Sequence, residues 1–174
     1  MNTVDTKILS EKDLLEALSK SLTNYVEGYK LLEKEVKALE DQQQKFPGKY
    51  LSRASEGNYE DLLILASQLK HRAIKLDRNA GGLLVNTDTD LDYYEAQILL
   101  YFAEPFLKDK GFDKVTDLLR NSYLSSSKEI KKLRVVKGKL KHLMDSAEAL
   151  VRAFESDEVN FRKFMDMKNK LRGI

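Results

Sequence analysis

The residues best suited to chemistry are a dense run of cations near the C-terminal end of the sequence. Between positions 128 and 141, seven basic residues face one acid, Glu129. Cations at this density attract a polyanion such as a nucleic acid, because neutralised phosphates release counterions. The basic residues are Lys128, Lys131, Lys132, Arg134, Lys137, Lys139 and Lys141. The run predicts a DNA-binding surface, and the alternative is a set of charges that only keeps a helix solvated.

A second group of predicted DNA-binding cations lies earlier in the chain. It consists of Lys70, Arg72, Lys75 and Arg78. The formal net charge is only +2, but residues 1–127 hold 17 Lys+Arg against 21 Asp+Glu, whereas residues 128–174 hold 13 against 7. The C-terminal end is therefore basic. Acidic faces of the first predicted helix could instead form ion pairs with the cations of the 128–141 run, within one bundle or across subunits.

Catalytic and metal-binding chemistry has little support in this sequence. There is no cysteine, and the two histidines, His71 and His142, are too few for a histidine-built metal centre. The sequence has no glycine-rich phosphate loop, GxSxG or HExxH motif. The spacing Asp88-x-Asp90-x-Asp92 lacks the glycine and the final glutamate of a calcium loop. We expect a protein that is not an enzyme and that uses no metal or cofactor.

The composition predicts the helices that must position these cations. Only 2 prolines and 8 glycines interrupt 174 residues, of which 42% are hydrophobic and 33% charged. This predicts an all-α fold of five to six helices in a single domain, residues 1–174. No window holds 18 uninterrupted apolar residues, and the N-terminus lacks the basic and hydrophobic regions of a signal peptide. We therefore expect a cytoplasmic protein without a membrane span.

The first predicted helix spans residues 10–45. Ser10 and Asp13 form a capping-box-like start, and Pro47–Gly48 should end the helix. Apolar residues recur at alternating steps of four and three, as in a coiled coil. They are Leu18, Leu22, Tyr25, Tyr29, Leu32, Val36 and Leu39. At about 34 residues this helix is longer than a compact monomer needs, which favours oligomerisation through this seam.

The central part of the chain, residues 58–124, is predicted to hold three helices. Their ranges are Asn58–Asn79, Leu91–Lys108 and Asp113–Leu124. Asn58 should cap the first of them and Gly81–Gly82 should stop it. The acidic segment Asn86–Asp92 should cap the second, which is apolar enough to be mostly buried, and Pro105 should kink or break it.

The C-terminal part, residues 126–174, is predicted to be a basic helical hairpin. Ser125–Ser127 offer caps for a long fifth helix, and a last helix should start at Ser156 and fold back on it. The fifth helix has a second heptad seam. It consists of Leu133, Val136, Leu140, Leu143, Ala147, Leu150 and Phe154. The two seams could close on one another inside a monomeric bundle, or the first could join copies of the chain.

The last fifty residues resemble a known family. The segments Tyr123–Leu133, Ala149–Phe154, Glu155–Ser156 and Asn160–Phe164, followed by Asp166–Lys168, resemble the end of the UvsY-type recombination mediators of large tailed bacteriophages. The shared pattern is a serine or acidic cap, a long helix, a tight turn and a short basic helix. The hydrophobic segment from Leu91 to Leu107 has no counterpart in that pattern.

The resemblance implies a small helical protein that forms rings and binds single-stranded DNA. Such mediators help a phage recombinase displace the single-strand-binding protein, so the implied partners are that DNA, a recombinase and a single-strand-binding protein in the host cytoplasm. The family's central basic segment corresponds either to the group from Lys70 to Arg78 or to Lys49 and Arg53. The sequence thus favours a DNA-binding mediator, and the alternative is a coiled-coil scaffold or a small phage inhibitor of a host protein.

Overall fold

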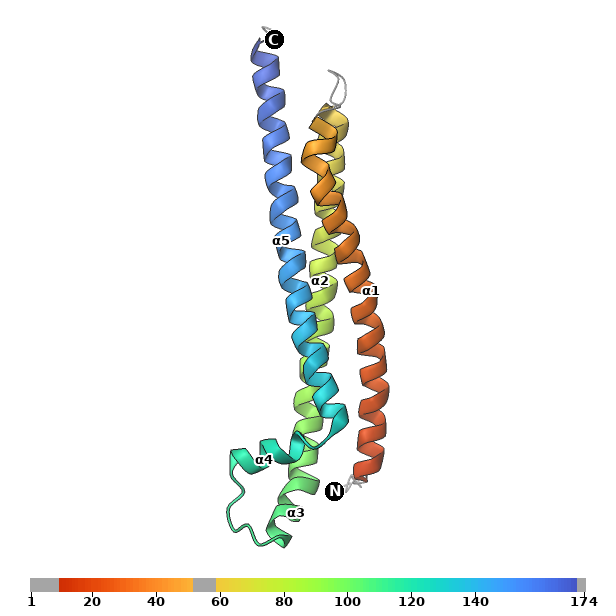
Figure 1. The fold of residues 1–174 in the computed structure, drawn as a ribbon, viewed down its shortest axis with the longest axis vertical. Coiled ribbons are helices and arrows are strands. Elements are labelled where there is room, and N and C mark those ends of the chain that lie inside the picture. Colours follow the sequence, from red (N-terminus) through yellow and green to blue (C-terminus); the bar gives the residue numbers. More distant parts are fainter. Residues whose placement is uncertain (1–9, 52–58, 172–174) are drawn as a thin grey trace, which may run out of the picture. The chain divides into compact units, whose positions relative to one another are not determined.

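The computed structural model describes residues 10–51 and 59–171, and these confirm the all-α class. Figure 1 shows the helices in chain order, with α1 to α5 labelled. They are α1 (Glu11–Leu51), α2 (Tyr59–Ile98), the π-helical segment η1 (Leu99–Ala103), α3 (Glu104–Asp109), α4 (Asp117–Leu124) and α5 (Lys128–Leu171). Asn58, the predicted cap of the second helix, and residues 52–57 before it lie outside the described residues.

The chain packs into two compact units, and each of the three long helices contributes a segment to both. Unit 1 contains the residues up to Gly28 together with Leu83–Lys139. Unit 2 contains Tyr29–Gly82 together with the residues from Leu140 onward. The two groups of predicted DNA-binding cations therefore fall mainly into different units: those on α2 into unit 2, and those on α5, except Lys141, into unit 1.

Helix α1 begins as predicted but ends later. The backbone N–H of Asp13 donates to Ser10 Oγ at 3.2 Å, and Ser10 Oγ donates to Asp13 Oδ2 at 2.6 Å, which confirms the capping box. The prediction that Pro47–Gly48 ends the helix is wrong, because α1 continues to Leu51. The turn before the proline is held by Phe46, whose buried ring lies edge-on to Phe161 with centroids 5.4 Å apart.

The prediction that Gly81–Gly82 stops the second helix is also wrong, because α2 runs on to Ile98. Its buried positions keep a spacing of three and four residues on both sides of the glycines. They are Leu62, Ala66, Leu69, Ala73, Leu76, Ala80, Thr87, Leu91, Tyr94 and Ile98. Thr87 is a polar member of this stripe, and its hydroxyl donates to the carbonyl of Leu83 at 2.7 Å. Packing along one face thus outweighs the low helix propensity of two glycines.

The segment Asn86–Asp92 lies inside α2 and does not cap a new helix, contrary to the prediction. Its polar groups bond to other helices of unit 1. The Tyr25 hydroxyl donates to Asp90 Oδ2 at 2.8 Å and is 3.2 Å from the Asn86 carbonyl, and burial raises the pKa of this hydroxyl. Gly28 lets α1 and α2 approach closely, since a Cβ atom there would lie 2.9 Å from Leu83 Cδ2.

After α2 the chain passes through η1 into α3, with Pro105 in the first turn of α3. The chain stays helical through the predicted break near that proline, and only the hydrogen-bond pattern changes, from π- to α-helical at residue 104. Gly111, with φ of 85°, follows the end of α3. The prediction that this segment is mostly buried is only partly right, because Leu100, Tyr101 and Phe106 are exposed. Phe106 is only partly covered by Tyr123 of α4, whose ring centroid lies 5.7 Å away.

Helix α4 packs against η1 and is shorter than predicted, beginning at Asp117 rather than Asp113. Thr116 caps it, because its hydroxyl oxygen accepts from the Leu119 N–H at 3.4 Å. Arg120 of α4 donates to Glu104 Oε1 of α3 at 2.7 Å. This ion pair fixes the short helix within unit 1.

Helix α5 is one continuous helix, so the predicted hairpin with a new helix at Ser156 is wrong. Its predicted start is confirmed, because Ser127 Oγ accepts from the Ile130 N–H at 3.3 Å. The buried stripe passes from Phe154 through Glu158 to Phe161. Glu158 is thus a charged member of an apolar stripe, and this carboxylate has partners of its own in unit 2.

The chain itself covers much of the first heptad seam. Leu18 and Leu22 are buried in unit 1, whereas Val36 and Leu39 are buried in unit 2. In unit 2 the core also contains partly buried side chains of α1. These are Tyr29 and Leu32, packed against α2 and α5 residues. The alternative that the seams close within one chain accounts for this burial, and the prediction that copies of the chain join through this seam gains no support.

Candidate nucleic-acid interface

The structure divides the predicted DNA-binding cations into paired and exposed side chains. The paired ones are Lys70 and Arg72 on α2 and Arg134 and Lys137 on α5. Each forms its ion pair with a carboxylate of the same unit. A cation already paired in this way gains little from a phosphate, because binding would have to break the existing pair. These four residues therefore serve the fold.

On α2, the two paired cations link the helices of unit 2. Lys70 pairs with the buried carboxylate of Glu158 on α5, which also pairs with Arg162. The hydrogen bond from Lys70 lowers the pKa of Glu158 below its usual range. Arg72 Nη2 donates to Glu35 Oε1 of α1 at 2.6 Å, and Arg72 Nη1 donates to Gln42 Oε1 at 3.3 Å.

On α5, the two paired cations meet acids of α2 in unit 1. Arg134 Nε donates to Glu95 Oε1 at 2.8 Å, and Lys137 pairs with Asp88. For these two cations the pairing acids belong to α2 and not to the first helix, contrary to the expectation for a single bundle. Both acids belong to the second half of α2, which the sequence predicts to be a separate helix with its own cap.

The remaining predicted cations lie in water. Of the predicted DNA-binding cations, six are exposed and form no ion pair with a described residue: Lys75 and Arg78 on α2, and Lys128, Lys131, Lys132 and Lys141 on α5. Lys139 is exposed as well. The α5 segment thus presents a denser set of accessible ammonium groups than the α2 segment does.

Four of these lysines share one side of α5 within unit 1, and we call them the α5 basic face. They are Lys128, Lys131, Lys132 and Lys139. At about 100° per residue they fall within an arc of about 100° around the helix. Glu129 is the only acid between them in sequence, and it is half-buried, with Ser127 Oγ donating to its Oε2 at 3.4 Å. The exposed charged side chains of this segment are therefore all basic, and the exposed Val135 lies among them.

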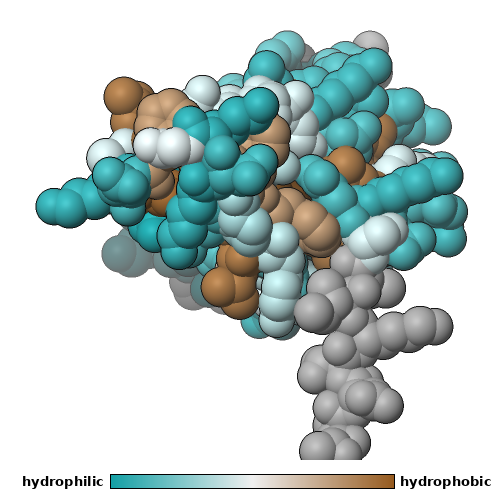
Figure 2. Space-filling view, turned by 90° about the horizontal axis from the view of Figure 1, so that it is seen from below, coloured by the Kyte–Doolittle hydropathy of each residue, from teal (hydrophilic) through white to brown (hydrophobic). Residues whose placement is uncertain are grey.

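A second surface of unit 1 was missed by the sequence analysis. Large apolar side chains are exposed along η1, α3 and α4, among them Leu100 at 58%, Phe106 at 48% and Leu118 at 80%. Figure 2 shows brown apolar groups among hydrophilic ones on this end. The sequence signal was a short apolar segment broken by Pro105 and Gly111, too short to be packed on all sides.

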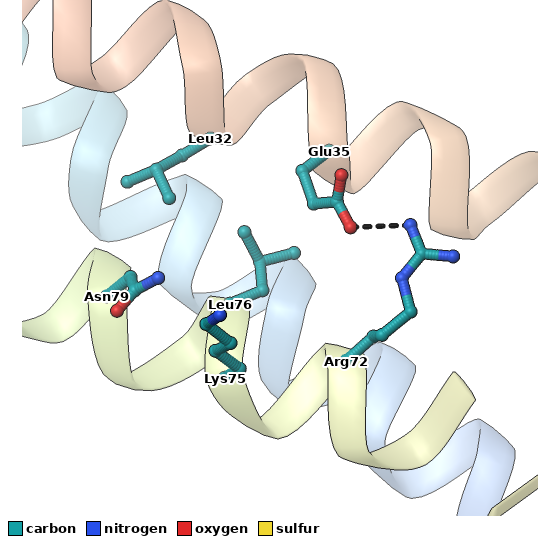
Figure 3. Close-up of a pocket in the computed structure, with 6 residues that line it drawn as sticks. All are labelled: Leu32, Glu35, Arg72, Lys75, Leu76 and Asn79. Atoms are coloured by element: carbon teal, nitrogen blue, oxygen red, sulfur yellow. Dashed lines mark hydrogen bonds and ion pairs between the residues drawn. The ribbon is translucent and has the colours of Figure 1, made fainter. Parts of the chain in front are cut away.

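Unit 2 contains an open groove between α1 and α2, with a volume of about 320 Å³. Figure 3 shows the residues that line it. They are Leu32 and Glu35 from α1, and Arg72, Lys75, Leu76 and Asn79 from α2. Two of the predicted DNA-binding cations, Arg72 and Lys75, therefore border a concave site rather than an extended flat surface.

Other classes of site find no counterpart in the described part of the chain. No three His, Asp or Glu side chains gather there in a way that could hold a metal ion. None of the described helices is long and apolar enough to cross a bilayer. In the comparisons with known proteins, no family model, curated protein or solved structure matches this chain.

Proposed function

We propose that the chain binds single-stranded DNA through the α5 basic face. The observation that supports this most is the uniform sign of the exposed charges between Lys128 and Lys139. Two cations of this segment, Arg134 and Lys137, are paired with acids on α2 and are therefore not available to phosphates. Lys128, Lys131 and Lys132 are exposed and form no ion pair with a described residue, which is the arrangement that attracts phosphates.

The physical basis of such binding is counterion release. Each phosphate neutralised on a single strand changes the logarithm of affinity by about −0.7 per decade of salt. If three or four lysines of the α5 basic face each meet one phosphate, the slope is about −2 to −3. Lys128 and Lys139 are separated by about 16 Å along the helix axis, since each residue adds about 1.5 Å. Several phosphates of one strand fit along this distance.

The mediator role extends this proposal. A few phosphate contacts per chain give weak binding, but several chains on one strand multiply them by mass action. A strand held in this way is presented to a recombinase while the single-strand-binding protein is displaced, as the resemblance implies. This role rests on strand binding, so strand binding is the property to test first.

The test is oligonucleotide binding at low and high salt, with a charge-reversed variant. The double substitution K131E and K132E should weaken binding at low salt by about tenfold or more and reduce the salt slope by about one. The control is K12E and K114E, which changes net charge equally at two exposed lysines of unit 1 outside the α5 basic face. Salt-independent binding, absent binding, or an equal loss in both variants would contradict the proposal.

The second candidate is a protein-interaction module, and one observation favours it. Leu100, Phe106 and Leu118 are exposed in unit 1, and apolar groups of this size commonly mark contacts with other proteins. The two candidates separate in one experiment. A protein partner whose binding survives K131E and K132E but is lost in L100S and L118S would identify a protein-interaction module. DNA binding lost only in the lysine variant would identify the DNA-binding protein.

A further inference from the structure

We infer that the groove between α1 and α2 in unit 2 binds a small organic monoanion, with Lys75 as its counter-ion. The anion's apolar part would lie against Leu32 and Leu76. Figure 3 shows these two leucines between the helices, with the Arg72–Glu35 pair towards one end and Asn79 towards the other. The inference does not depend on DNA binding, because the groove belongs to unit 2 and the α5 basic face to unit 1.

The charges around the groove determine the sign and number of charges on the ligand. The guanidinium of Arg72 is compensated by Glu35 at 2.6 Å and further held by Gln42 at 3.3 Å. Lys75 is exposed and forms no ion pair with a described residue. One positive charge therefore remains after Arg72 and Glu35 cancel. A ligand with a single negative charge restores neutrality without breaking the existing pair.

The walls of the groove determine what carries that charge. Leu32 is half-buried and packed against the core of unit 2, so it offers the accessible part of the apolar wall, and Leu76, at 2% exposure, closes the groove behind it. Asn79 lies one helical turn beyond Lys75, where its exposed amide can donate to an anionic oxygen. An inorganic ion would leave the leucines unused, whereas a short carbon chain would cover them.

The size of the groove limits the ligand to a small molecule. Sites for drug-sized ligands have volumes of about 300 to 1,000 Å³, and this groove lies at the lower end with about 320 Å³. We therefore assign it a short-chain monocarboxylate rather than a polymer. Because the groove is open to water, affinity should be modest, with dissociation constants in the millimolar range.

Hexanoate is the probe that tests the assignment, followed by NMR of the full chain. Hexanoate should shift the methyl signals of Leu32 and Leu76 and the side-chain amide of Asn79, with saturation. K75Q should weaken hexanoate binding by about threefold to fivefold, as expected for an exposed ion pair. K141Q is the matched control, because Lys141 is another exposed lysine of unit 2 that does not line the groove, and it should leave affinity unchanged.

Two further probes test the contributions of the charge and of the carbon chain separately. Hexanol has a similar chain without the charge, and acetate has the charge without the chain, so both should bind several times more weakly than hexanoate. Hexanol binding as tightly as hexanoate would overturn the role of Lys75, and acetate binding as tightly would overturn the role of the leucines. The absence of saturable shifts with hexanoate would overturn the inference altogether.

Discussion

The two groups of cations differ in what the fold does with them. On α2, Lys70 and Arg72 are paired within unit 2, and the exposed Lys75 borders a groove. On α5, the paired Arg134 and Lys137 face α2, while the α5 basic face keeps its lysines in water. The first group mainly joins helices, and the second mainly presents charge. A count of basic residues does not separate these roles, but their partners do.

The largest effect that distinguishes paired from exposed cations is expected when the partner of Lys70 is removed. In E158Q, the ammonium of Lys70 loses a charged partner of which only 8% is exposed, and Arg162 loses one as well. Breaking a fully buried pair costs about 3–5 kcal/mol, and the partial exposure of Lys70, at 21%, reduces the expected loss of stability to about 2 kcal/mol. Denaturant unfolding measures this loss.

The matched control for this prediction is K75Q, which removes an exposed cation of the same helix. Its free energy of unfolding should stay within about 0.5 kcal/mol of the original chain. If E158Q were no less stable than K75Q, paired and exposed cations would contribute alike. The comparison between the two groups would then lose its energetic basis.

The neighbouring acid, Asp157, gives the corresponding test for a carboxylate without a partner. Its Oδ2 atom is buried with no hydrogen-bond partner among the described residues, and burial raises the pKa of this carboxyl. A raised folded pKa means that stability is lost as the pH rises through it. D157N should therefore gain about 1 kcal/mol near neutral pH and nothing in acid below the ordinary aspartate range. Denaturant unfolding at both pH values tests this.

Glu158 should show the opposite dependence, because Lys70 lowers its folded pKa. Its contribution to stability is present above the pKa of an unfolded glutamate and is lost as the pH falls through the folded value. A gain from D157N that persists unchanged in acid would show that charge burial is not its cause. It would also remove the contrast between a partnered and an unpartnered carboxylate.

The smallest effect that we expect is the difference in coupling energy between a paired and an exposed lysine of α5. A double-mutant cycle with K137M and D88N should give a coupling energy of about 0.5 kcal/mol, since both side chains are partly exposed. The parallel cycle with K132M and D88N should give a value near zero. Equal coupling in both cycles would show that the α5 basic face is also neutralised by α2.

Much of the fold could be predicted from the sequence. The all-α class follows from the scarcity of proline and glycine, and the Ser10 and Ser127 caps follow from side chains that bond locally. The continuity of α2 and α5 could not be predicted by the same reasoning. Thr87 and Glu158 occupy buried positions of otherwise apolar stripes, and both resemble helix ends until their partners are known.

The candidate site could be predicted only as a set of residues. The sequence shows which side chains are basic and which of them share a side of a helix. The carboxylates that pair with them lie far away in the chain. Lys70 is 88 residues from Glu158, and Arg134 is 39 residues from Glu95. Tertiary packing therefore decides which cations remain unpaired, and helical periodicity alone cannot predict this.

The most direct test of the central claim is to map, by NMR of the full chain, which residues respond to a short single-stranded oligonucleotide at low salt. We predict shifts at Lys128, Lys131 and Lys132 that fade as salt is added, with Lys70 and Arg72 unchanged. The control for specificity of charge is the K131E and K132E variant, which should show little response. Shifts centred on α2, or no saturable shifts on α5, would contradict the assignment of the α5 basic face as the DNA-binding surface.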